Sequence, residues 1–375
     1  MVSHEITNFA RTLQLSLDDL LSHQTHSGAI AASPDFSQYG YCWLRDGSFI
    51  AWSLMQAGKY EAAGKFHEWC VEAIRGVVSQ MQAAIDRHQH GDPVEARTAP
   101  PARFTLEGQV DVDDWPNFQI DGYGTWLWAL DLYLAQKETL LPPTWTDVVW
   151  LTVLYIAELA LEPCFDVWEE NEGKTHTSTV CSVLAGLRAA LRLFAKKSDS
   201  ELYVVTAAID KAQRWLKARS QNGWFSKSDG DEDVDASTIW LAAPMAVVAI
   251  DDPVMHETIK RISQTLEYDG GIRRYAADTY YGGGAWPVLT CSLGLYHARA
   301  GRITEATACL NSTLAHMSRD GSLCEQFGGD VRSPERYQSW VDMWGTPAQD
   351  LMWSHAMVVG LIVELENQRR IPADV

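Results

Sequence analysis

The sequence has 375 residues, with 49 acidic and 30 basic side chains and 16 tryptophans, which suits one large domain or two ordinary ones. The net charge of −19 argues against a nucleic-acid partner and against an anionic membrane surface, because phosphate groups repel an acidic protein. No stretch approaches the roughly 18 apolar residues of a membrane span, and the N-terminus lacks the pattern of a signal peptide, so we expect a cytoplasmic protein.

Helical periodicity dominates the chain, and strand-like alternation is scarce. Twelve amphipathic segments are predicted as helices, in chain order at 5–24, 46–57, 60–84, 122–135, 145–161, 176–195, 200–219, 237–250, 253–266, 288–300, 303–318 and 354–369. Long segments rich in Gly, Trp, Asp and Tyr precede every second helix, at 25–45, 86–121, 163–175, 220–236, 267–287 and 319–353. This alternation predicts an all-α fold in which six helical hairpins close into a ring, with the long loops on one rim.

The long loops combine aromatic residues with carboxylates, and two of them add an arginine. The clusters are YGYCWLRD at 39–46, WPNFQIDG at 115–122, WEEN at 168–171, RYAADTYYGGGAW at 274–286 and CEQF at 324–327. Sugar recognition needs this mixture, because aromatic faces pack on the C–H side of a sugar ring and charged forks bind paired hydroxyls. One Arg-Asp dipeptide is usually a surface ion pair, but five such clusters at equivalent positions indicate a functional rim.

Two glutamates are candidates for acid–base chemistry. Glycoside hydrolysis needs a protonated acid on the leaving oxygen and an ionised base or nucleophile across the sugar ring. Glu169 suits the acid, because its neighbours Trp168 and Glu170 both disfavour ionisation; the alternative is a helix-start carboxylate that interacts with the helix dipole. Glu325 is the candidate base. Because 325 − 169 = 156 residues separate the two, only a fold that closes on itself can bring them together.

Six motifs in sequence order resemble glycoside hydrolase family 15, the glucoamylase family. They are YGYCWLRDGS, WPNFQIDG, VWEEN, RRYAADTYYGGGAW, CEQF and LMWSHA, and the resemblance spans roughly residues 27 to 356. It implies an (α/α)6 barrel, in agreement with the twelve helices expected from periodicity. Bacterial and archaeal members commonly carry an N-terminal β-sandwich and fungal members a starch-binding domain. We expect neither here, and a single catalytic domain over residues 1–375.

The resemblance also implies residue roles where the motifs are intact. Glu169 corresponds to the general acid and Glu325 to the general base that activates water, with inversion at the anomeric carbon. Arg45 and Asp46 resemble the pair that grips hydroxyls of the terminal glucose. The full set of implied substrate-binding residues is Tyr39, Trp43, Arg45, Asp46, Trp115, Asp121, Glu170, Arg274, Trp286 and Trp353. A pocket closed at one end by charged forks admits only a chain terminus, so we expect an exo-acting enzyme that releases one β-D-glucose at a time.

The expected substrate is a small α-glucoside taken from its non-reducing end. Without a secretion signal or a starch anchor, short imported oligosaccharides are the accessible substrates, so isomaltose and isomalto-oligosaccharides are favoured and maltose-type α-1,4 links come second. Three alternatives remain: a trehalase-like hydrolase of the same family, a catalytically silent oligosaccharide-binding protein, and a phosphorolytic enzyme. The last would need a cationic phosphate site near Glu325, which the CEQF loop does not offer.

No cofactor and no bound metal is expected. The seven cysteines are widely spaced and form no CxxC pair, which predicts neither a disulfide framework nor a zinc site. His88 and His90 beside Asp92 have a spacing that could suit metal ligands, but a solvated polar loop explains them more simply.

Overall fold

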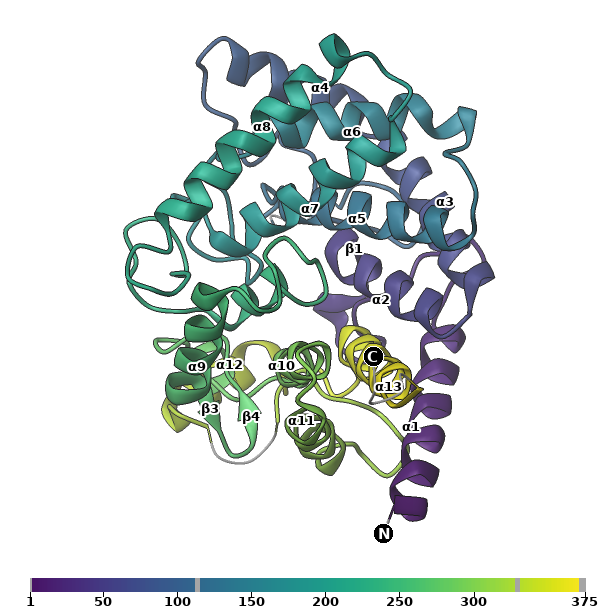
Figure 1. Ribbon diagram of the computed structural model, residues 1–375, viewed down its shortest axis with the longest axis vertical. Helices are drawn as coiled ribbons and strands as arrows, with labels where there is room; N and C mark the ends of the chain where they lie inside the picture. The colour runs from purple at the N-terminus through teal and green to yellow at the C-terminus, as the bar shows by residue number, and fades with distance from the viewer. Residues whose placement is uncertain (1, 112–114, 328–330, 371–375) are drawn as a thin grey trace.

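The computed structural model describes residues 2–111, 115–327 and 331–370, and the helices form a closed ring (Figure 1). Its inner layer consists of α2 (Leu44–Gln56), α5 (Asp121–Gln136), α7 (Thr177–Leu193), the 3-10 helix η3 (Ala236–Leu241), α10 (Pro287–Arg299) and α13 (Met352–Arg370). Each inner element contacts the next in this order, and α13 packs back against α2. That last contact closes the ring, so the expected all-α (α/α)6 barrel is confirmed.

The outer layer pairs with the inner one. It consists of α1 (Val2–Ser22), α3 (Tyr60–Arg75), α4 (Val78–Gln89), α6 (Thr146–Glu158), α8 (Asp199–Ala218), α9 (Pro253–Leu266) and α11 (Ile303–Ala315). The contacts α1 with α13, α3 with α2, α8 with α7, α9 with η3 and α11 with α10 join the two layers. Inner helices are buried on nearly every side, as in α2, whereas outer helices such as α8 bury one face only.

Two glycines allow a close approach between the inner helices α5 and α7. A Cβ atom on Gly124 of α5 would lie 2.4 Å from the backbone oxygen of Ser182 on α7, and one on Gly186 would lie 2.7 Å from the backbone oxygen of Gly124. The two backbones therefore touch where neither residue carries a side chain. This contact fixes the spacing between the helices that lie behind the WPNFQIDG and VWEEN loops.

Three segments differ from the sequence-based prediction. The helix expected at 60–84 is divided at Gly76 and Val77 into α3 and α4, because Val77 leaves the helical region with φ −119° and ψ 13°. The helix expected at 237–250 ends after η3. Pro244 lacks a backbone N–H and disfavours a helical Ala243, and Ala246 adopts a positive φ of 52°.

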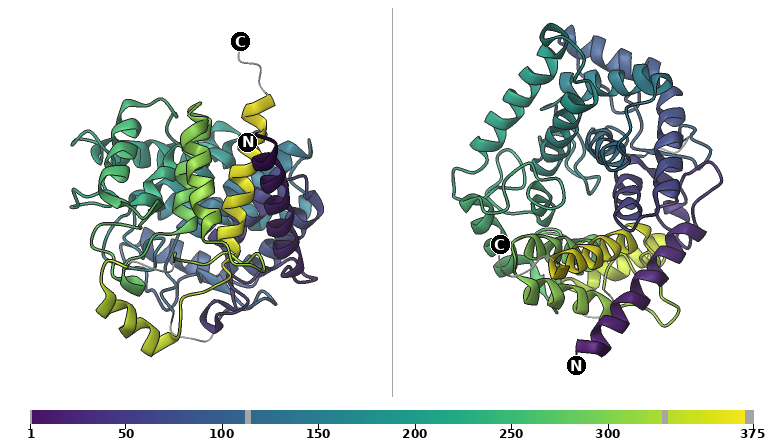
Figure 2. Two further views of the ribbon diagram at one scale, coloured as in Figure 1. Left: turned by 90° about the horizontal axis from the view of Figure 1, so that it is seen from below. Right: turned by 45° about the vertical axis from the view of Figure 1, so that its right-hand side comes forward.

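The third difference is an additional helix, α12 (Pro334–Trp344), inside the segment 319–353 that was expected to be a loop. Its main packing partner is the short helix η4 (Tyr280–Gly282) and not a helix of the barrel. In the left panel of Figure 2, α12 (yellow-green) stands at the lower edge with the loops, and the C-terminus of α13 lies at the opposite end of the molecule. The long loops and α12 thus share one rim.

Short strands shape the loops on this rim. β1 (Cys42–Trp43) pairs antiparallel with β2 (Arg103–Phe104), so that Trp43 lies opposite Arg103. β3 (Glu267–Tyr268) pairs with β4 (Gly271–Ile272), and two further 3-10 turns are η1 (Ser37–Tyr39) and η2 (Pro143–Trp145). The pairing of β1 with β2 anchors the loop before α2 to the loop before α5.

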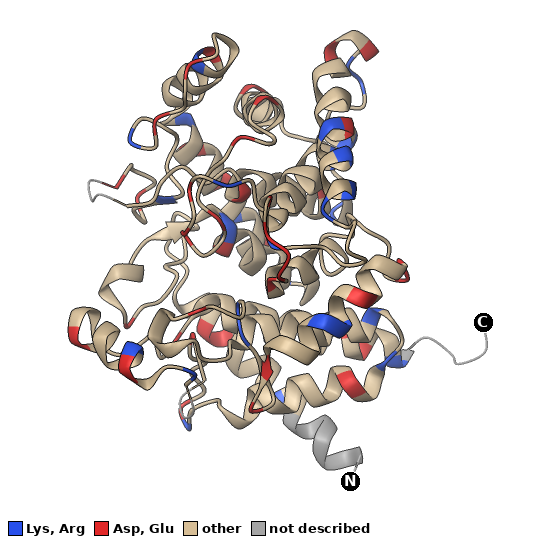
Figure 3. Ribbon diagram, turned by 90° about the vertical axis from the view of Figure 1, so that its left-hand side faces the viewer, with Lys and Arg blue, Asp and Glu red and all other residues tan. Residues whose placement is uncertain are grey.

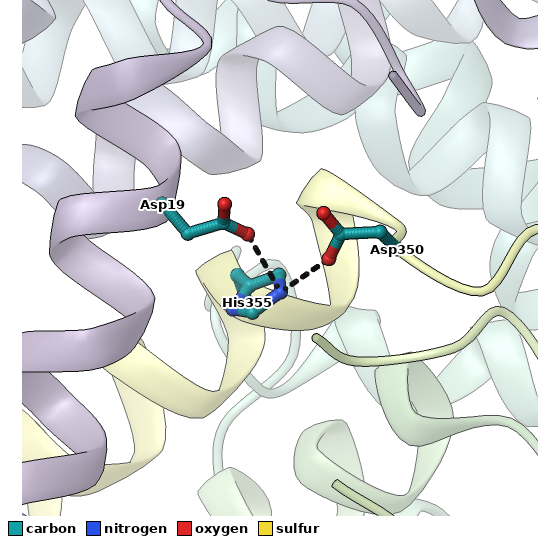
Figure 4. A group of neighbouring side chains, drawn as sticks. All are labelled: Asp19, Asp350 and His355. Carbon is teal, nitrogen blue, oxygen red and sulfur yellow. Dashed lines mark hydrogen bonds and ion pairs between the residues drawn. The ribbon is translucent and has the colours of Figure 1, made fainter. Parts of the chain in front are cut away.

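A side-chain cluster fastens the two ends of the described chain to each other (Figure 4). His355 of α13 is fully buried, and its Nε2 lies 3.0 Å from Asp19 Oδ2 on α1 and 2.9 Å from Asp350 Oδ1. The backbone N–H of Leu323 points at the same nitrogen over 3.2 Å, so three parts of the chain meet at this imidazole ring. Ser33 Oγ donates to the backbone oxygen of Asp350 over 2.7 Å, so the loop before α2 joins the same cluster.

Charged positions are spread over the structure rather than collected on one element. Figure 3 shows Asp and Glu on many helices and loops, with Lys and Arg among them. None of the helices in the described residues is long and apolar enough to cross a membrane.

Candidate active site

The long loops enclose a pocket with a volume of about 620 Å³. Eleven of the twelve site residues predicted from the sequence line it: Tyr39, Trp43, Arg45, Asp46, Trp115, Glu169, Glu170, Arg274, Trp286, Glu325 and Trp353. Asp121 is the exception. It is 2% exposed, does not line the pocket, and its Oδ2 accepts a hydrogen bond from Arg45 Nη1 over 3.2 Å. The two candidate glutamates, far apart in sequence, thus face one cavity.

Glu169 lies in a tight turn. Its backbone φ is 66°, in the left-handed region, and its N–H donates to the backbone oxygen of Asp166 over 2.9 Å. The Asp166 side chain holds the turn from inside, because its Oδ1 accepts the backbone N–H groups of Trp168 and Glu170, each over 2.9 Å. Since α7 begins only at Thr177, the alternative of a helix-start carboxylate is wrong for Glu169.

One oxygen of the Glu169 carboxyl receives three hydrogen bonds. Oε1 accepts from Trp43 Nε1 over 2.7 Å, from Trp115 Nε1 over 3.0 Å and from Gln119 Nε2 over 3.0 Å. Among the described residues, no hydrogen-bond donor contacts Oε2. The carboxyl group is therefore held by one oxygen and presents the other to the cavity.

The Arg45–Asp46 pair lies at the start of α2. Arg45 Nε lies 3.3 Å from Asp46 Oδ2, and its Nη1 donates to Gln119 Oε1 over 2.9 Å. Burial raises the pKa of Asp46 to about 6, with Arg45 opposing the shift and Glu169 adding to it. Gln119 thus connects Arg45 to Glu169 through one amide group.

A second arginine and carboxylate pair lies across the pocket. Arg274 is 2% exposed; its Nε donates to Asp278 Oδ2 over 2.8 Å and its Nη2 to Glu170 Oε1 over 3.1 Å. The Tyr275 hydroxyl donates to the other oxygen of Glu170. Asp278 and Glu170 hold the guanidinium plane in one orientation, which is what a fork for paired hydroxyls requires.

Glu325 is 1% exposed, and its Oε1 accepts a hydrogen bond from the Tyr39 hydroxyl over 2.8 Å. The Tyr280 hydroxyl lies 2.8 Å from the Tyr39 hydroxyl and 3.5 Å from each Glu325 carboxylate oxygen. Burial raises the pKa of Glu325 to about 7, although Tyr39 and Arg274 oppose the shift. A carboxylate that binds its proton this strongly can accept one from water near neutral pH.

Tryptophans form much of the wall. Seven of the 16 line the pocket: Trp43, Trp115, Trp168, Trp286, Trp340, Trp344 and Trp353. In the described structure, the buried atoms Trp286 Nε1 and Trp353 Nε1 have no hydrogen-bond partner. These two N–H groups are therefore closed to solvent, and Trp286 and Trp353 line the pocket with their rings.

Several residues of the site were missed in the sequence. Tyr280 lines the pocket, whereas Gln119 and Asp278 bind lining residues from outside it. All three lie inside quoted motifs, but their side chains carry no signal of their partners until the fold is known. Trp340 belongs to α12, whose helix was not predicted, and Trp344 lies outside the motifs. The described residues include one group with metal-ligand spacing, the cluster of Asp19, Asp350 and His355, and it does not line the pocket.

Comparison with known proteins agrees with this geometry. An isomaltose glucohydrolase from Kribbella flavida is 34% identical over 368 residues, which cover 97% of this chain and 94% of the relative. The structure of a glycosidase variant in complex with glucose has a TM-score of 0.90 at 33% identity and covers 97% of this chain and 98% of that chain. A trehalase from Mycolicibacterium smegmatis is 24% identical over 67% of this chain and 40% of its own length.

The model of the glycosyl hydrolases family 15 matches residues 11–363, which include all twelve predicted site residues. This match covers most of the chain, and the relative from Kribbella flavida extends it over nearly the whole length. The chain therefore belongs to glycosyl hydrolases family 15 and is a glycoside hydrolase of an inverting family.

Proposed function

We propose that this enzyme is an exo-acting α-glucoside hydrolase that releases β-D-glucose from the non-reducing end of small isomaltose-type oligosaccharides. The observation that carries the proposal is the joint presence of Glu169 and Glu325 in one cavity with two arginine–carboxylate forks. At about 620 Å³ the cavity lies within the range of small-molecule sites, about 300–1,000 Å³. Such a pocket suits the end of a sugar chain.

Glu169 is proposed as the general acid. Three N–H donors already occupy Oε1, so the proton of the neutral carboxyl group is carried by Oε2. From there it passes to the glycosidic oxygen as the bond between that oxygen and C1 breaks. The leaving sugar then departs as an alcohol.

Glu325 is proposed as the general base. It takes one proton from a water molecule while the water oxygen bonds to C1 on the face opposite the leaving group, which inverts the anomeric carbon. The hydrogen bond from Tyr39 holds Oε1, and burial makes the carboxylate a stronger base than an exposed glutamate. Each turnover leaves Glu325 protonated and Glu169 ionised, and exchange with solvent restores both.

The remaining residues are proposed to bind the terminal glucose. Arg45, Asp46, Arg274 and Glu170 supply charged partners for hydroxyl groups, and the indoles of Trp43, Trp115, Trp286 and Trp353 supply ring faces. Asp121 is proposed to position Arg45 instead of touching the sugar, because it lies outside the pocket lining.

The isomaltose preference is supported by the relative from Kribbella flavida, whose name gives that substrate. Trehalose is the second candidate, because a trehalase matches two thirds of the chain at lower identity. The catalytically silent sugar-binding protein is not supported, since the chain belongs to a family of hydrolases and carries both carboxylates in its pocket.

A panel of isomaltose, maltose, nigerose, kojibiose and trehalose, followed by proton NMR, tests the proposal. We expect the highest kcat/KM on isomaltose and β-glucose as the first product. α-Glucose as the first product would contradict the mechanism, and a higher kcat/KM on trehalose would contradict the substrate. Glu169→Gln and Glu325→Gln should each lower kcat by about 10² to 10⁴, the usual contribution of a general acid or base.

A further inference from the structure

A buried arginine lies behind the two indoles that hold the Glu169 carboxyl group. Arg103 is fully buried and does not line the pocket, so it cannot touch a bound sugar. Its guanidinium carbon lies 3.6 Å from the ring centroid of Trp115 and 5.2 Å from that of Trp43. It also lies 4.0 Å from the ring of Tyr41.

The arginine itself is held from several directions. Its Nε donates to Asp111 Oδ2 over 2.7 Å, Nη2 donates to the same oxygen, and Nη1 donates to the backbone oxygen of Gln38 over 3.0 Å. Strand pairing places its backbone opposite Trp43. The guanidinium plane therefore has a defined orientation, and the indoles packed against it are restricted in turn.

We propose that Arg103 is a positioning residue for the acid step, acting through Trp43 and Trp115 on Glu169. A cation over an aromatic face attracts the electrons of the ring, which makes the indole N–H group more polar and a stronger hydrogen-bond donor. Both N–H groups end on Glu169 Oε1, at 2.7 and 3.0 Å. Arg103 thereby keeps Oε1 occupied and Oε2 directed at the glycosidic oxygen. This inference rests on the proposed role of Glu169.

Substrates with different leaving groups distinguish a positioning role of Arg103 from a merely structural one. Isomaltose needs its leaving oxygen protonated, whereas the fluoride of α-D-glucosyl fluoride leaves without a proton from the enzyme. Both substrates need the base and the same glucose-binding residues. Damage to the acid step therefore lowers turnover of isomaltose selectively, and a general loss of structure lowers both.

The experiment measures kcat for both substrates in Arg103→Met, Arg103→Lys and Glu169→Gln. Arg261→Met is the matched control, because Arg261 stacks on Trp224 at 4.0 Å, outside the pocket lining. For Arg103→Met we expect a loss of about 10 to 10² in kcat on isomaltose, the effect of a misplaced catalytic group, and a loss of less than about threefold on the fluoride. Arg103→Lys keeps the charge and should recover part of the loss, and it carries the test if the methionine variant does not fold.

Equal losses on both substrates in Arg103→Met and Arg103→Lys would overturn the inference, as would unchanged turnover of isomaltose. Glu169→Gln decides between this outcome and a failure of the proposed function. If Glu169→Gln also shows no selective loss on isomaltose, the acid assignment itself is wrong. If Glu169→Gln is selective and the Arg103 variants are not, the acid stands and Arg103 has no positioning role.

Discussion

Replacing Glu325 with glutamine should stabilise the fold above pH 7 while it lowers kcat by about 10² to 10⁴. Burial raises the pKa of Glu325 from 4.5 to about 7. A group whose pKa is higher in the folded state than in the unfolded state stabilises the folded protein while the group is protonated. This contribution is lost as the pH rises from the unfolded pKa through the folded pKa. Each pKa unit corresponds to about 1.36 kcal/mol, so ionising Glu325 lowers the free energy of unfolding by about 3 kcal/mol. Glutamine stays neutral and avoids that loss.

The assay is urea denaturation of the wild type and Glu325→Gln at pH 4, 5, 6, 7 and 8. The difference in free energy of unfolding should rise by about 3 kcal/mol between pH 4.5 and 7.5 and stay constant outside that interval. In thermal melts at pH 8, the gain corresponds to roughly 4 °C for a chain of this length. A changed hydrogen bond with Tyr39 adds a constant offset, so the pH dependence is the informative quantity.

A difference that does not change with pH would refute the reasoning, because it would mean that Glu325 keeps an ordinary pKa in the folded protein. Asp210→Asn is the control for general charge effects, since Asp210 is exposed on α8. Its difference from the wild type should stay within about 0.5 kcal/mol at every pH. An active site that lowers stability in order to hold a reactive carboxylate is a common compromise in enzymes.

The other predictions concern pH, the Arg45 fork and the contact between α5 and α7. In the wild type, kcat/KM should fall about tenfold per pH unit below pH 7, because Glu325 gains its proton. It should fall more steeply below about pH 6, where Asp46 is protonated too. A flat profile from pH 5 to 7 would contradict the base assignment. Asp121→Asn should lower kcat/KM on isomaltose by about 10 to 10², because Arg45 loses a charged hydrogen bond, with Asp210→Asn unchanged. Gly124→Ala should lower the free energy of unfolding by about 1–3 kcal/mol through overpacking, whereas Gly173→Ala, in open space, should stay within about 0.5 kcal/mol; equal effects would rule out the close contact.

The ring and most of the pocket residues were predictable because both depend on local sequence patterns. Helical periodicity and the alternation of long and short connections indicated the closed ring, and the loop motifs contained eleven pocket residues that the structure brings together. The segment 237–250 was mispredicted because its apolar periodicity outweighed the signal of Pro244. The α12 helix was missed in a segment already assigned to a loop.

Partnerships between distant residues could not be read from the sequence. Asp121 was expected to touch the substrate because it belongs to the WPNFQIDG motif of the family resemblance, yet its carboxylate faces Arg45. Arg103 lies in none of the six motifs. Its stacking on Trp115 depends on the pairing of two-residue strands that lie far apart in the sequence and carry no strand-like alternation. Such contacts arise from three-dimensional packing, which periodicity does not encode.

Closure of the ring has a consequence for the order of folding. The backbone N–H of Met352 donates to the backbone oxygen of Ala32, and the N–H of Glu325 donates to the backbone oxygen of Ala348. The last segment of the ring therefore holds both the loop before α2 and the loop that carries Glu325. Contacts between residues more than 300 positions apart form late in folding, because closing a long loop costs entropy before the new contacts offset that cost. Ser354 of α13 also donates its hydroxyl to the backbone oxygen of Cys324 over 2.9 Å, so a nascent chain that still lacks α13 has Glu169 but lacks this support for the Glu325 loop. We expect hydrolytic activity to arise only after α13 has been synthesised, and a nick before α13 to abolish it.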